Sequence, residues 1–483
     1  MNEAIKRFCD RYAKALEDGH AALFVGAGFS KPAGFVEWKE LLRAVAEELG
    51  LNVDLEPDLI SLAQYYVNEH GGNRHLLNTL LIEQFTRDTR VFENHRLIAR
   101  LPLTTIWTTN YDQLIEQSYR DAYKRLDVKV TKEQLTFPLP KRDALLYKMH
   151  GCITQPHDAV LIKEDYETYN DHRALFSELL RGDLISKVFL FLGYSFNDPN
   201  IEYVLGRLRS LFGTNQPQHY WIVKRAEAPR STGSDQVTTN KYEWRRQELR
   251  VNDLKRYGIQ AMLIDDFSEI TEMLEELNRR VHSKNIFVSG SAYEYSPMNR
   301  ERTESLAKAI GREIIRRNYN LISGLGLGIG AAAMLGAAET LYGSNKINVG
   351  ERVYLRPFPR EALIGMTKEE FNTKHRQDII ATAGMIIFIS GNNRDPSDGK
   401  SVVSAGVLEE FRIAQELGKR PIPIGATGHA ARQIWQEVFQ SLDTFFPEGG
   451  VKEHFAVLGD DAKTNDEIVN AVFAIAESVT SSR

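Results

Sequence analysis

Short apolar segments alternate with longer amphipathic segments along almost the whole chain, and this alternation constrains the fold more than any other feature. Helical patterns occur at 36–50, 58–70 and 268–283. Apolar strands that alternate with helices predict a parallel sheet covered by helices on both faces. The strands expected in the first part of the chain are 21–28, 103–110, 144–151, 187–195, 219–224 and 261–265.

The pattern then restarts, which is consistent with a chain of 483 residues being too long for one ordinary core. We predict α/β architecture with two doubly wound parallel-sheet, Rossmann-like domains, residues 1–283 and 284–483. The polar segment 228–244 contains turn formers and is expected to be a loop or flap. Expected elements of the second domain are strands at 285–291, 352–358, 384–391 and 420–425, a helix at 299–317 and a strand–turn–helix unit at 320–339.

Composition excludes several classes of protein. The chain is 42% apolar and 26% charged, with a formal net charge of −5, so we expect neither nucleic acid nor an anionic membrane as partner. No apolar run approaches about 18 residues and the N-terminus lacks an apolar signal segment, which indicates a cytoplasmic protein. Cys9 and Cys152 are the only cysteines, too few for a four-cysteine zinc module, and no metal is expected.

Four predicted strands of the first domain end in polar, glycine-bearing segments. Glycine at such a turn allows backbone amides to approach a phosphate closely. A single segment of this kind fits a plain turn, but the carboxyl ends of parallel strands line one crevice, so the four together predict a functional pocket. The segments are Gly26–Ser30, Trp107–Asp112, Met149–Gly151 and Gly193–Asn200.

These segments resemble the sirtuin superfamily over about residues 15–283. The matches are Gly-Ala-Gly-x-Ser at 26–30, Thr-x-Asn-x-Asp at 108–112, His-Gly at 150–151 and Gly-x-Ser at 193–195, in the family order. The resemblance implies NAD⁺ as substrate. It further implies that Gly26, Ala27, Gly28 and Ser30 hold the diphosphate and adjacent ribose, that Asn110 and Asp112 lie by the nicotinamide-side ribose and amide, that His150 is the general base, and that Gly193 and Ser195 contact the adenosine half.

The chemistry favours these residue types. Cleavage of an N-glycosidic bond passes through an oxocarbenium-like state and needs a base that works near neutral pH, which histidine supplies. Taken singly, His150 also fits a packed core histidine, Asp112 a helix cap, and Asn197 with Asp198 a turn before Pro199.

Two departures from the family pattern indicate which molecule reacts with the ribose after nicotinamide leaves. The zinc cysteines are missing, and residues 31–38 read Lys-Pro-Ala-Gly-Phe-Val-Glu-Trp where family deacylases carry Asp-Phe-Arg. Both losses disfavour protein deacylation, so water is the expected acceptor and ADP-ribose and nicotinamide the expected products. Cyclisation to cyclic ADP-ribose stays open as a side reaction.

The second domain carries another set of glycine turns and charges, with Ser-Gly-Leu-Gly-x-Gly at 323–328 and Gly-Val-x-Glu-Glu at 406–410. These motifs resemble the SLOG superfamily of nucleotide-binding domains. A Pro-Gly-Gly-x-Gly-Thr stretch of related phosphoribohydrolases is replaced at 402–407, which favours binding over catalysis. The residues expected to bind a nucleotide signal are Gly290, Ser291, Gly324, Gly326, Arg376, Arg394, Lys400, Gly406, Glu409 and Glu410. The family resemblance implies Arg376 on phosphate and Glu410 on ribose.

The order of a sirtuin-like and a SLOG domain resembles the NAD⁺-cleaving effectors of the Thoeris anti-phage systems of bacteria. This resemblance implies an activator, a cyclic ADP-ribose isomer made by a partner protein with a TIR domain. It also implies depletion of cellular NAD⁺ and assembly as a homotetramer. Two alternatives stay open, a protein deacylase and a non-enzymatic nucleotide sensor or scaffold, and the sequence leaves the identity of the isomer open.

Overall fold

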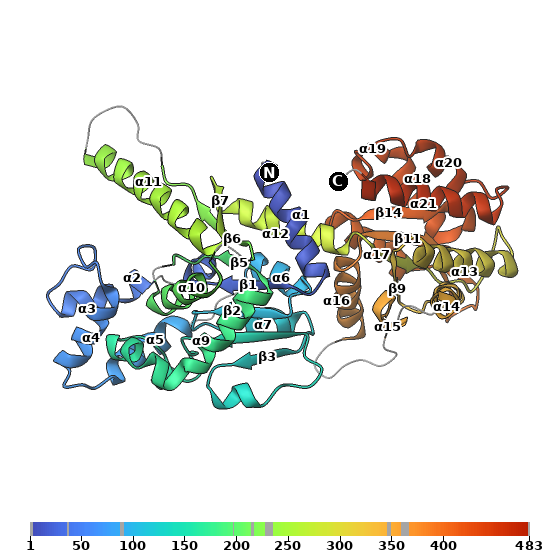
Figure 1. The fold of residues 1–483 in the computed structure, drawn as a ribbon. Helices are drawn as coiled ribbons and strands as arrows, with labels where there is room; N and C mark the ends of the chain where they lie inside the picture. The colour runs from blue at the N-terminus through green and yellow to red at the C-terminus, as the bar shows by residue number, and fades with distance from the viewer. Residues whose placement is uncertain are drawn as a thin grey trace. The chain divides into compact units, whose positions relative to one another are not determined.

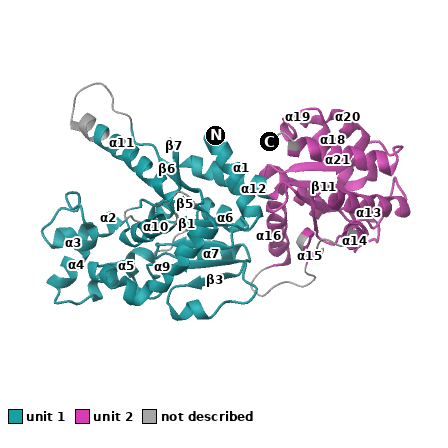
Figure 2. Cartoon of the chain, viewed as in Figure 1, with its two compact units in different colours: residues 1–281 teal, residues 282–483 magenta. Residues whose placement is uncertain are grey.

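The structure, a computed structural model, describes residues 3–35, 38–86, 91–196, 198–213, 217–227, 235–344, 349–358 and 367–481. It divides into two compact units, Met1–Val281 and His282–Arg483 (Figure 2). The boundary expected at residue 283 lies close to this division. Each unit has its own parallel sheet with helices between the strands, so the predicted fold class is confirmed (Figure 1).

In the described part of the first unit, seven parallel strands form one sheet in the order β3-β4-β2-β1-β5-β6-β7. The chain passes from β1 to one side of the sheet and returns at β5 on the other side. In open α/β sheets ligands bind where the strand order reverses, which predicts a ligand-binding crevice at the carboxyl end of β1. The strands are β1 (Ala21–Val25), β2 (Thr105–Thr108), β3 (Leu126–Lys129), β4 (Ala144–Lys148), β5 (Val188–Leu192), β6 (His219–Lys224) and β7 (Ile259–Ile264).

Helices cover both faces of this sheet, and successive side chains of each strand point to opposite faces. In β1, Leu23 and Val25 pack with α1, α6, α7 and α12, whereas Ala22 and Phe24 pack with α9 and α10. The helices of the unit are α1 (Glu3–Glu17), α2 (Trp38–Leu41), α3 (Arg43–Glu48), α4 (Leu59–Glu69), α5 (His75–Phe85), α6 (Glu93–Arg100), α7 (Leu114–Asp121), α8 (Lys163–Glu167), α9 (Tyr169–Ser186), α10 (Pro199–Phe212), α11 (Asp235–Leu254) and α12 (Ser268–His282).

The second unit has a sheet in the order β10-β9-β8-β11-β14, with all neighbouring strands parallel. Its direction changes on either side of β8, which places a second crevice at the carboxyl end of that strand. A short antiparallel hairpin, β12–β13, lies outside the main sheet. The strands are β8 (Asn285–Ser289), β9 (Asn320–Ser323), β10 (Val353–Leu355), β11 (Met385–Ile389), β12 (Asn392–Arg394), β13 (Ser401–Val403) and β14 (Arg420–Ile424).

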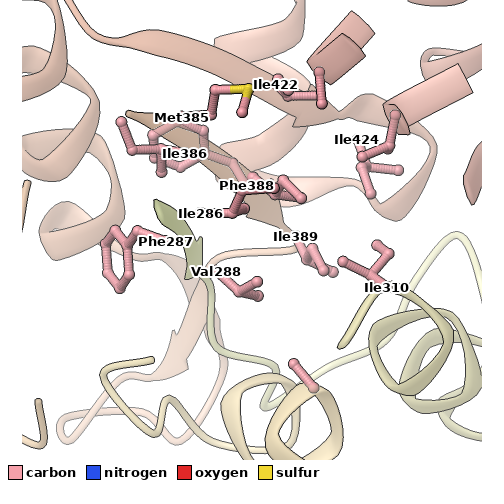
Figure 3. Packing of buried hydrophobic residues seen from close by; sticks show 14 of the residues in the cluster. Ile286, Phe287, Val288, Ile310, Met385, Ile386, Phe388, Ile389, Ile422 and Ile424 are labelled. Atoms are coloured by element: carbon pink, nitrogen blue, oxygen red, sulfur yellow. The ribbon is translucent and has the colours of Figure 1, made fainter. Parts of the chain in front are cut away.

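Aliphatic side chains fill the core of this unit. Figure 3 shows Ile286 and Val288 of β8 beside Ile386 and Phe388 of β11, with Ile310 of the helix α13 nearby. Within the described residues of both units, no helix is long and apolar enough to cross a membrane. The helices of the second unit are α13 (Arg300–Arg316), α14 (Ile329–Ser344), α15 (Val349–Arg352), α16 (Lys368–Ala381), α17 (Ala405–Glu416), α18 (His429–Gln440), α19 (Leu442–Phe445), α20 (Lys452–Leu458) and α21 (Asn465–Ser481).

Three details differ from the sequence-based expectation. The expected loop 228–244 is wrong over its second half, because helix α11 begins at Asp235, while residues 228–234 lie outside the described residues. The helix expected at 36–50 is two short helices, α2 and α3, interrupted at Leu42. Strand β3 and the β12–β13 hairpin were not expected, because strands of three or four residues carry too little periodicity to recognise.

Candidate functional site

The ends of β1 and β2 are joined through the side chains of Asn110 and Thr108. Asn110 Nδ2 donates to Gly26 O and to Ser30 Oγ, each at 3.1 Å, and Thr108 Oγ1 donates to Val25 O at 2.9 Å. Asn110 Oδ1 is buried and has no hydrogen-bond partner within the described part of the chain. The Asn110 amide is therefore fixed by two hydrogen bonds, while its acceptor oxygen has no partner among the described residues.

The glycine loop at 26–30 packs backbone against backbone on the segment that follows β5. Gly28 N donates to Gly193 O at 3.0 Å, and a Cβ atom on Gly26 would lie 2.5 Å from the same oxygen. Gly193 has φ +61°, and its own Cβ would lie less than 3.0 Å from Phe29 N. Glycine is thus required at 26 and 193 by packing of the protein on itself, whatever ligand the loop holds.

The predicted residues around this crevice differ in accessibility. Ala27, Gly28 and Ser195 are exposed, whereas the side chains of Ser30, Asn110, Asp112 and His150 are buried. An exposed backbone beside buried polar side chains suits a ligand that enters from solvent and is held at its inner end. Asn197 lies outside the described residues.

His150 lies between aromatic rings and a carboxylate. Its Nε2 atom is 3.0 Å from Asp198 Oδ2, although the direction of the N–H does not satisfy hydrogen-bond geometry. The edges of the Tyr166 and Tyr169 rings flank the imidazole, with centroid distances of 5.6 and 6.3 Å. Asp198 also caps α10, because its Oδ1 accepts from Asn200 N at 2.8 Å.

Asp112 serves the start of α7, where its Oδ1 accepts from Leu114 N at 3.0 Å. Its carboxylate also interacts electrostatically with His95, a buried side chain whose two ring nitrogens have no hydrogen-bond partner within the described residues. Burial lowers the pKa of His95 to about 4, and the charge of Asp112 opposes this shift. The Asp112 side chain thus bonds to the first amide of α7, although the N-cap position itself is Gln113, and this contact does not exclude a second role.

Below the crevice lies a buried ion pair. Lys148 Nζ is 2.9 Å from Glu116 Oε1 and also donates to the carbonyl oxygen of Asp112. Burial alone would lower the pKa of Lys148, but Glu116, Cys152 and Asp112 together outweigh the effect of burial, and the pKa is raised. This pair ties the end of β4 to α7, and so fixes the distance between the segments that carry His150 and Asp112.

In the second unit, the glycine turns after β8 and β9 pack closely on each other and on β11. A Cβ atom on Gly290 would lie less than 3.0 Å from Ile389 O, and one on Gly326 would lie equally close to Gly290 O. Ser291 Oγ donates to Asn392 O at 3.0 Å, which links the first turn to the β12–β13 hairpin. A Cβ on Gly324 would contact the ring of Phe358.

Arg376 of α16 faces two carboxylates of α17. Its Nη1 is 2.8 Å from Glu409 Oε2, its Nε is 3.6 Å from Glu410 Oε1, and its guanidinium lies 5.1 Å from the Phe358 ring centroid. Glu410 is buried and accepts a hydrogen bond from Ser289. Burial raises the pKa of Glu410 to about 7, against the opposing effects of Ser289 and Arg376.

The structure groups only part of the predicted signal-binding set. Gly406 adjoins the Arg376 side chain, since a Cβ there would lie 2.5 Å from Arg376 Nη2. Arg394 and Lys400 belong to the exposed β12–β13 hairpin, where Lys400 pairs with Asp398 at 3.3 Å. No hydrogen bond or ion pair between described residues joins these two cations to Arg376.

Sequence reasoning missed several residues at both crevices. Asp198 was expected only to shape a turn, yet it contacts His150. In the second unit, Ser289, Phe358 and Thr373 contact the charged cluster, and Thr373 Oγ1 donates to Glu409. The position of Ser289 at the very end of a strand was the one available signal. Among the described residues, no group of His, Cys, Asp or Glu has the arrangement of a metal site.

Comparison with known proteins gives matches over both units. A model of the SIR2-like domain family matches residues 104–251, and a model of the Sir2- and TIR-associating SLOG family matches residues 269–479. The protein named NAD(+) hydrolase ThsA from Bacillus cereus is 39% identical over 480 residues, which cover 99% of each chain. The chain belongs to the ThsA family. Relatives of the same name from Acinetobacter baumannii and Enterococcus faecium are 40% and 38% identical, and the alignments cover 94% and 97% of this chain.

The two family models include different shares of the predicted site residues of this ThsA family member. The SIR2-like match begins at residue 104 and so includes Asn110, His150 and Gly193 but not the glycine loop at 26–30. That loop is connected to the matched region by the hydrogen bonds from Asn110 to Gly26 and Ser30. The SLOG match runs from α12 to α21 and includes the whole predicted signal-binding set.

Proposed function

We propose that the first unit hydrolyses NAD⁺ to ADP-ribose and nicotinamide. The observation that carries the proposal is Asn110 Oδ1, a buried acceptor without a hydrogen-bond partner among the described residues, at the point where the sheet changes direction. An unsatisfied buried acceptor costs about 1–3 kcal/mol, which a ribose hydroxyl or the attacking water would recover. The full-length relatives named NAD(+) hydrolase support the same chemistry.

The roles follow from where each group lies. Asn110 orients the nicotinamide-side ribose or the water, Asp112 adjoins the nicotinamide amide, and His150 is the general base. The glycine loop offers exposed backbone to a diphosphate, with Gly26, Ala27, Gly28 and Ser30 as its contacts. Gly193 and Ser195 contact the adenosine half.

The bond changes balance without a cofactor. The bond between ribose C1′ and the nicotinamide nitrogen breaks, and its electron pair leaves with nicotinamide, which becomes neutral. Water oxygen bonds to C1′, and the proton of that water passes to His150. No strong acid is needed because the leaving group departs from a cationic ring.

We further propose that a cyclic ADP-ribose isomer binds the second unit and activates the first. Gly290, Ser291, Gly324 and Gly326 would approach its phosphates, Arg376 would bind phosphate, and Glu410 a ribose hydroxyl. Gly406, Glu409, Arg394 and Lys400 complete the proposed set, with the two hairpin cations reaching the ligand from outside. A swing from about 1% to 99% active enzyme requires the signal to bind the active state about 10⁴-fold more tightly.

In this proposal a partner with a TIR domain makes the signal on infection, the chain acts as a homotetramer in the cytoplasm, and loss of NAD⁺ halts the infected cell. The match to a Sir2- and TIR-associating SLOG family supports the link to such a partner. The similarity to Defense-associated sirtuin 2 of Bacillus subtilis, 26% identical over 201 residues, supports a role in defence.

The decisive experiment follows nicotinamide release from NAD⁺ by the full chain, with and without each cyclic ADP-ribose isomer. We expect release with one isomer, and its loss in Asn110→Ala and His150→Ala while circular dichroism stays unchanged. The exposed residues Asn68 and His157 provide matched controls, because Asn68→Ala and His157→Ala remove the same kinds of side chain from solvent-exposed positions.

Each alternative has its own outcome. Full turnover in both crevice variants would contradict the proposed site. Binding of NAD⁺ without any product, under every condition, would instead support the sensor or scaffold interpretation. NAD⁺-dependent removal of the acetyl group from an acetylated peptide would support the deacylase.

A further inference from the structure

Asp198 is fixed in place by one of its carboxylate oxygens and faces His150 with the other. Oδ1 accepts from the amides of Asn200 and Ile201 at 2.8 and 3.4 Å, while Oδ2 lies 3.0 Å from His150 Nε2. Only 9% of the Asp198 side chain and 4% of the His150 side chain are exposed. The carboxylate is therefore held rigidly against the imidazole by the first turn of α10.

Among the described residues, the only ion pair of Asp198 is the one with His150. Burial raises the pKa values of the surrounding tyrosines, and the negative charge of Asp198 raises them further. The phenols in question are Tyr111, Tyr166, Tyr169 and Tyr194, and the charged groups beyond them are Arg74, Asp165, Arg173, Glu202 and Arg250.

A base in this position creates a buried positive charge when it accepts a proton, and a buried charge is costly unless it is paired. We propose that Asp198 is a positioning residue for His150, which keeps the proton of the imidazole on Nε2 and stabilises the imidazolium formed during hydrolysis. This inference rests on the proposed function. Nδ1 is then the nitrogen that takes the proton from water as the water oxygen bonds to C1′ and nicotinamide leaves.

The geometry is consistent with a pair that aligns when substrate binds. The Nε2–Oδ2 distance is that of a hydrogen bond but the direction is not, and such contacts commonly tighten in the substrate complex. In the catalytic triads of serine hydrolases, an aspartate likewise fixes the tautomer and orientation of the histidine and stabilises its imidazolium.

Helix capping alone would require no histidine partner. Asp58 caps α4 in the same way, with Oδ1 accepting from Ile60 N and Ser61 N at 3.1 Å each, and its side chain has no ion pair within the described residues. The chain therefore contains a matched cap that separates the two roles of Asp198.

The test measures nicotinamide release over pH for the full chain with NAD⁺ and the activating cyclic ADP-ribose isomer. Asp198→Asn keeps an oxygen that can cap α10 and loses the charge. We expect kcat to fall by at least about 10-fold with little change in KM. We also expect the pH profile of kcat/KM to change, because the imidazolium formed during hydrolysis loses its neighbouring carboxylate. Asp58→Asn should change neither quantity.

A double variant makes the dependence on His150 explicit. If Asp198 acts through the imidazole, Asp198→Asn combined with His150→Ala is no slower than His150→Ala alone. Unchanged kcat and pH profile in Asp198→Asn, or additive losses in the double variant, would overturn the inference while leaving NAD⁺ hydrolysis intact. A wild-type chain that releases no nicotinamide with any isomer would instead overturn the proposed function, and the inference with it.

Discussion

Gly193 and Phe29 lie backbone to backbone: a Cβ atom on Gly193 would lie less than 3.0 Å from the amide nitrogen of Phe29. The contact joins the segment after β5 to the glycine loop after β1. Asn110, which follows β2, holds the other side of that loop through Gly26 and Ser30. The loop is therefore held between the ends of β2 and β5, the two strands on either side of β1. Its position is thus determined before any nucleotide binds.

The first prediction concerns Gly193→Ala. Alanine at φ +61° is strained, and its Cβ would displace the glycine loop, so we expect a loss of about 2–4 kcal/mol in unfolding free energy and a strong loss of NAD⁺ binding. Gly182→Ala on α9 is the control, because its Cβ meets nothing within 4 Å. Chemical denaturation and NAD⁺ titration measure both effects, and equal behaviour of the two variants would contradict this role of Gly193 in holding the loop.

A second prediction concerns the buried pair of Lys148 and Glu116. Lys148→Met leaves the Glu116 carboxylate buried without its partner, and we expect the free energy of unfolding to fall by about 3–5 kcal/mol. The double variant Lys148→Met with Glu116→Leu removes both charges, and its free energy of unfolding should fall clearly less than that of the single variant. Tryptophan fluorescence during denaturation follows mainly the first unit, because four of the five tryptophans, Trp38, Trp107, Trp221 and Trp244, belong to it and Trp435 belongs to the second. A double variant as unstable as the single one would show that the carboxylate is not the cause.

The convergence of the first crevice could be predicted from the sequence because parallel strands end at the same edge. Asn110 and Gly26 follow consecutive apolar runs, and the hydrogen bond between them is what that rule leads one to expect. The same rule indicated Gly290 and Gly324 after neighbouring strands of the second sheet. Where the periodicity was long, the fold and the convergence of these strand ends followed from it.

What failed to be predicted depended on side-chain pairing between distant segments. Asp198 before a proline is typical of a turn, and nothing local reveals that its second oxygen faces a histidine after another strand. The pairing of Arg376 with Glu409 likewise depends on how α16 and α17 pack side by side. Helix α11 was missed in part because Thr and Asn near its start favour turns in isolation.

The third prediction tests the signal site through Arg376. This guanidinium is already paired with Glu409, so a phosphate must share it, and charge-assisted hydrogen bonds of this kind contribute about 1.5–3 kcal/mol. We expect Arg376→Ala to weaken binding of the activating cyclic ADP-ribose isomer at least about 10-fold by calorimetry. Arg412→Ala, which removes an exposed arginine of α17, should leave the affinity unchanged. Equal affinities for the two variants would argue against Arg376 as a phosphate ligand.

The last prediction follows from the raised pKa of Glu410. Its pKa is about 7 in the folded chain, compared with an ordinary value of 4.5, so the folded state holds this proton more tightly than the unfolded state does. The resulting stability is fully present below about pH 4.5 and is lost as pH rises through 7. The effect is on the order of 1–3 kcal/mol, because the carboxyl group is buried and must ionise beside Glu409.

Hydrogen exchange of the amides of β8 and α17, corrected for the intrinsic pH dependence of exchange, measures this locally. We expect protection in these elements to decrease between pH 5 and 8 in the wild-type chain. Glu410→Gln keeps the shape of the side chain without a titrating group, so its protection should vary less over the same range. Glu416→Gln changes an exposed carboxylate on the same helix and should follow the wild type. If protection of the Glu410→Gln chain decreases with pH as steeply as that of the Glu416→Gln chain, the ionisation of Glu410 does not control the stability of this crevice.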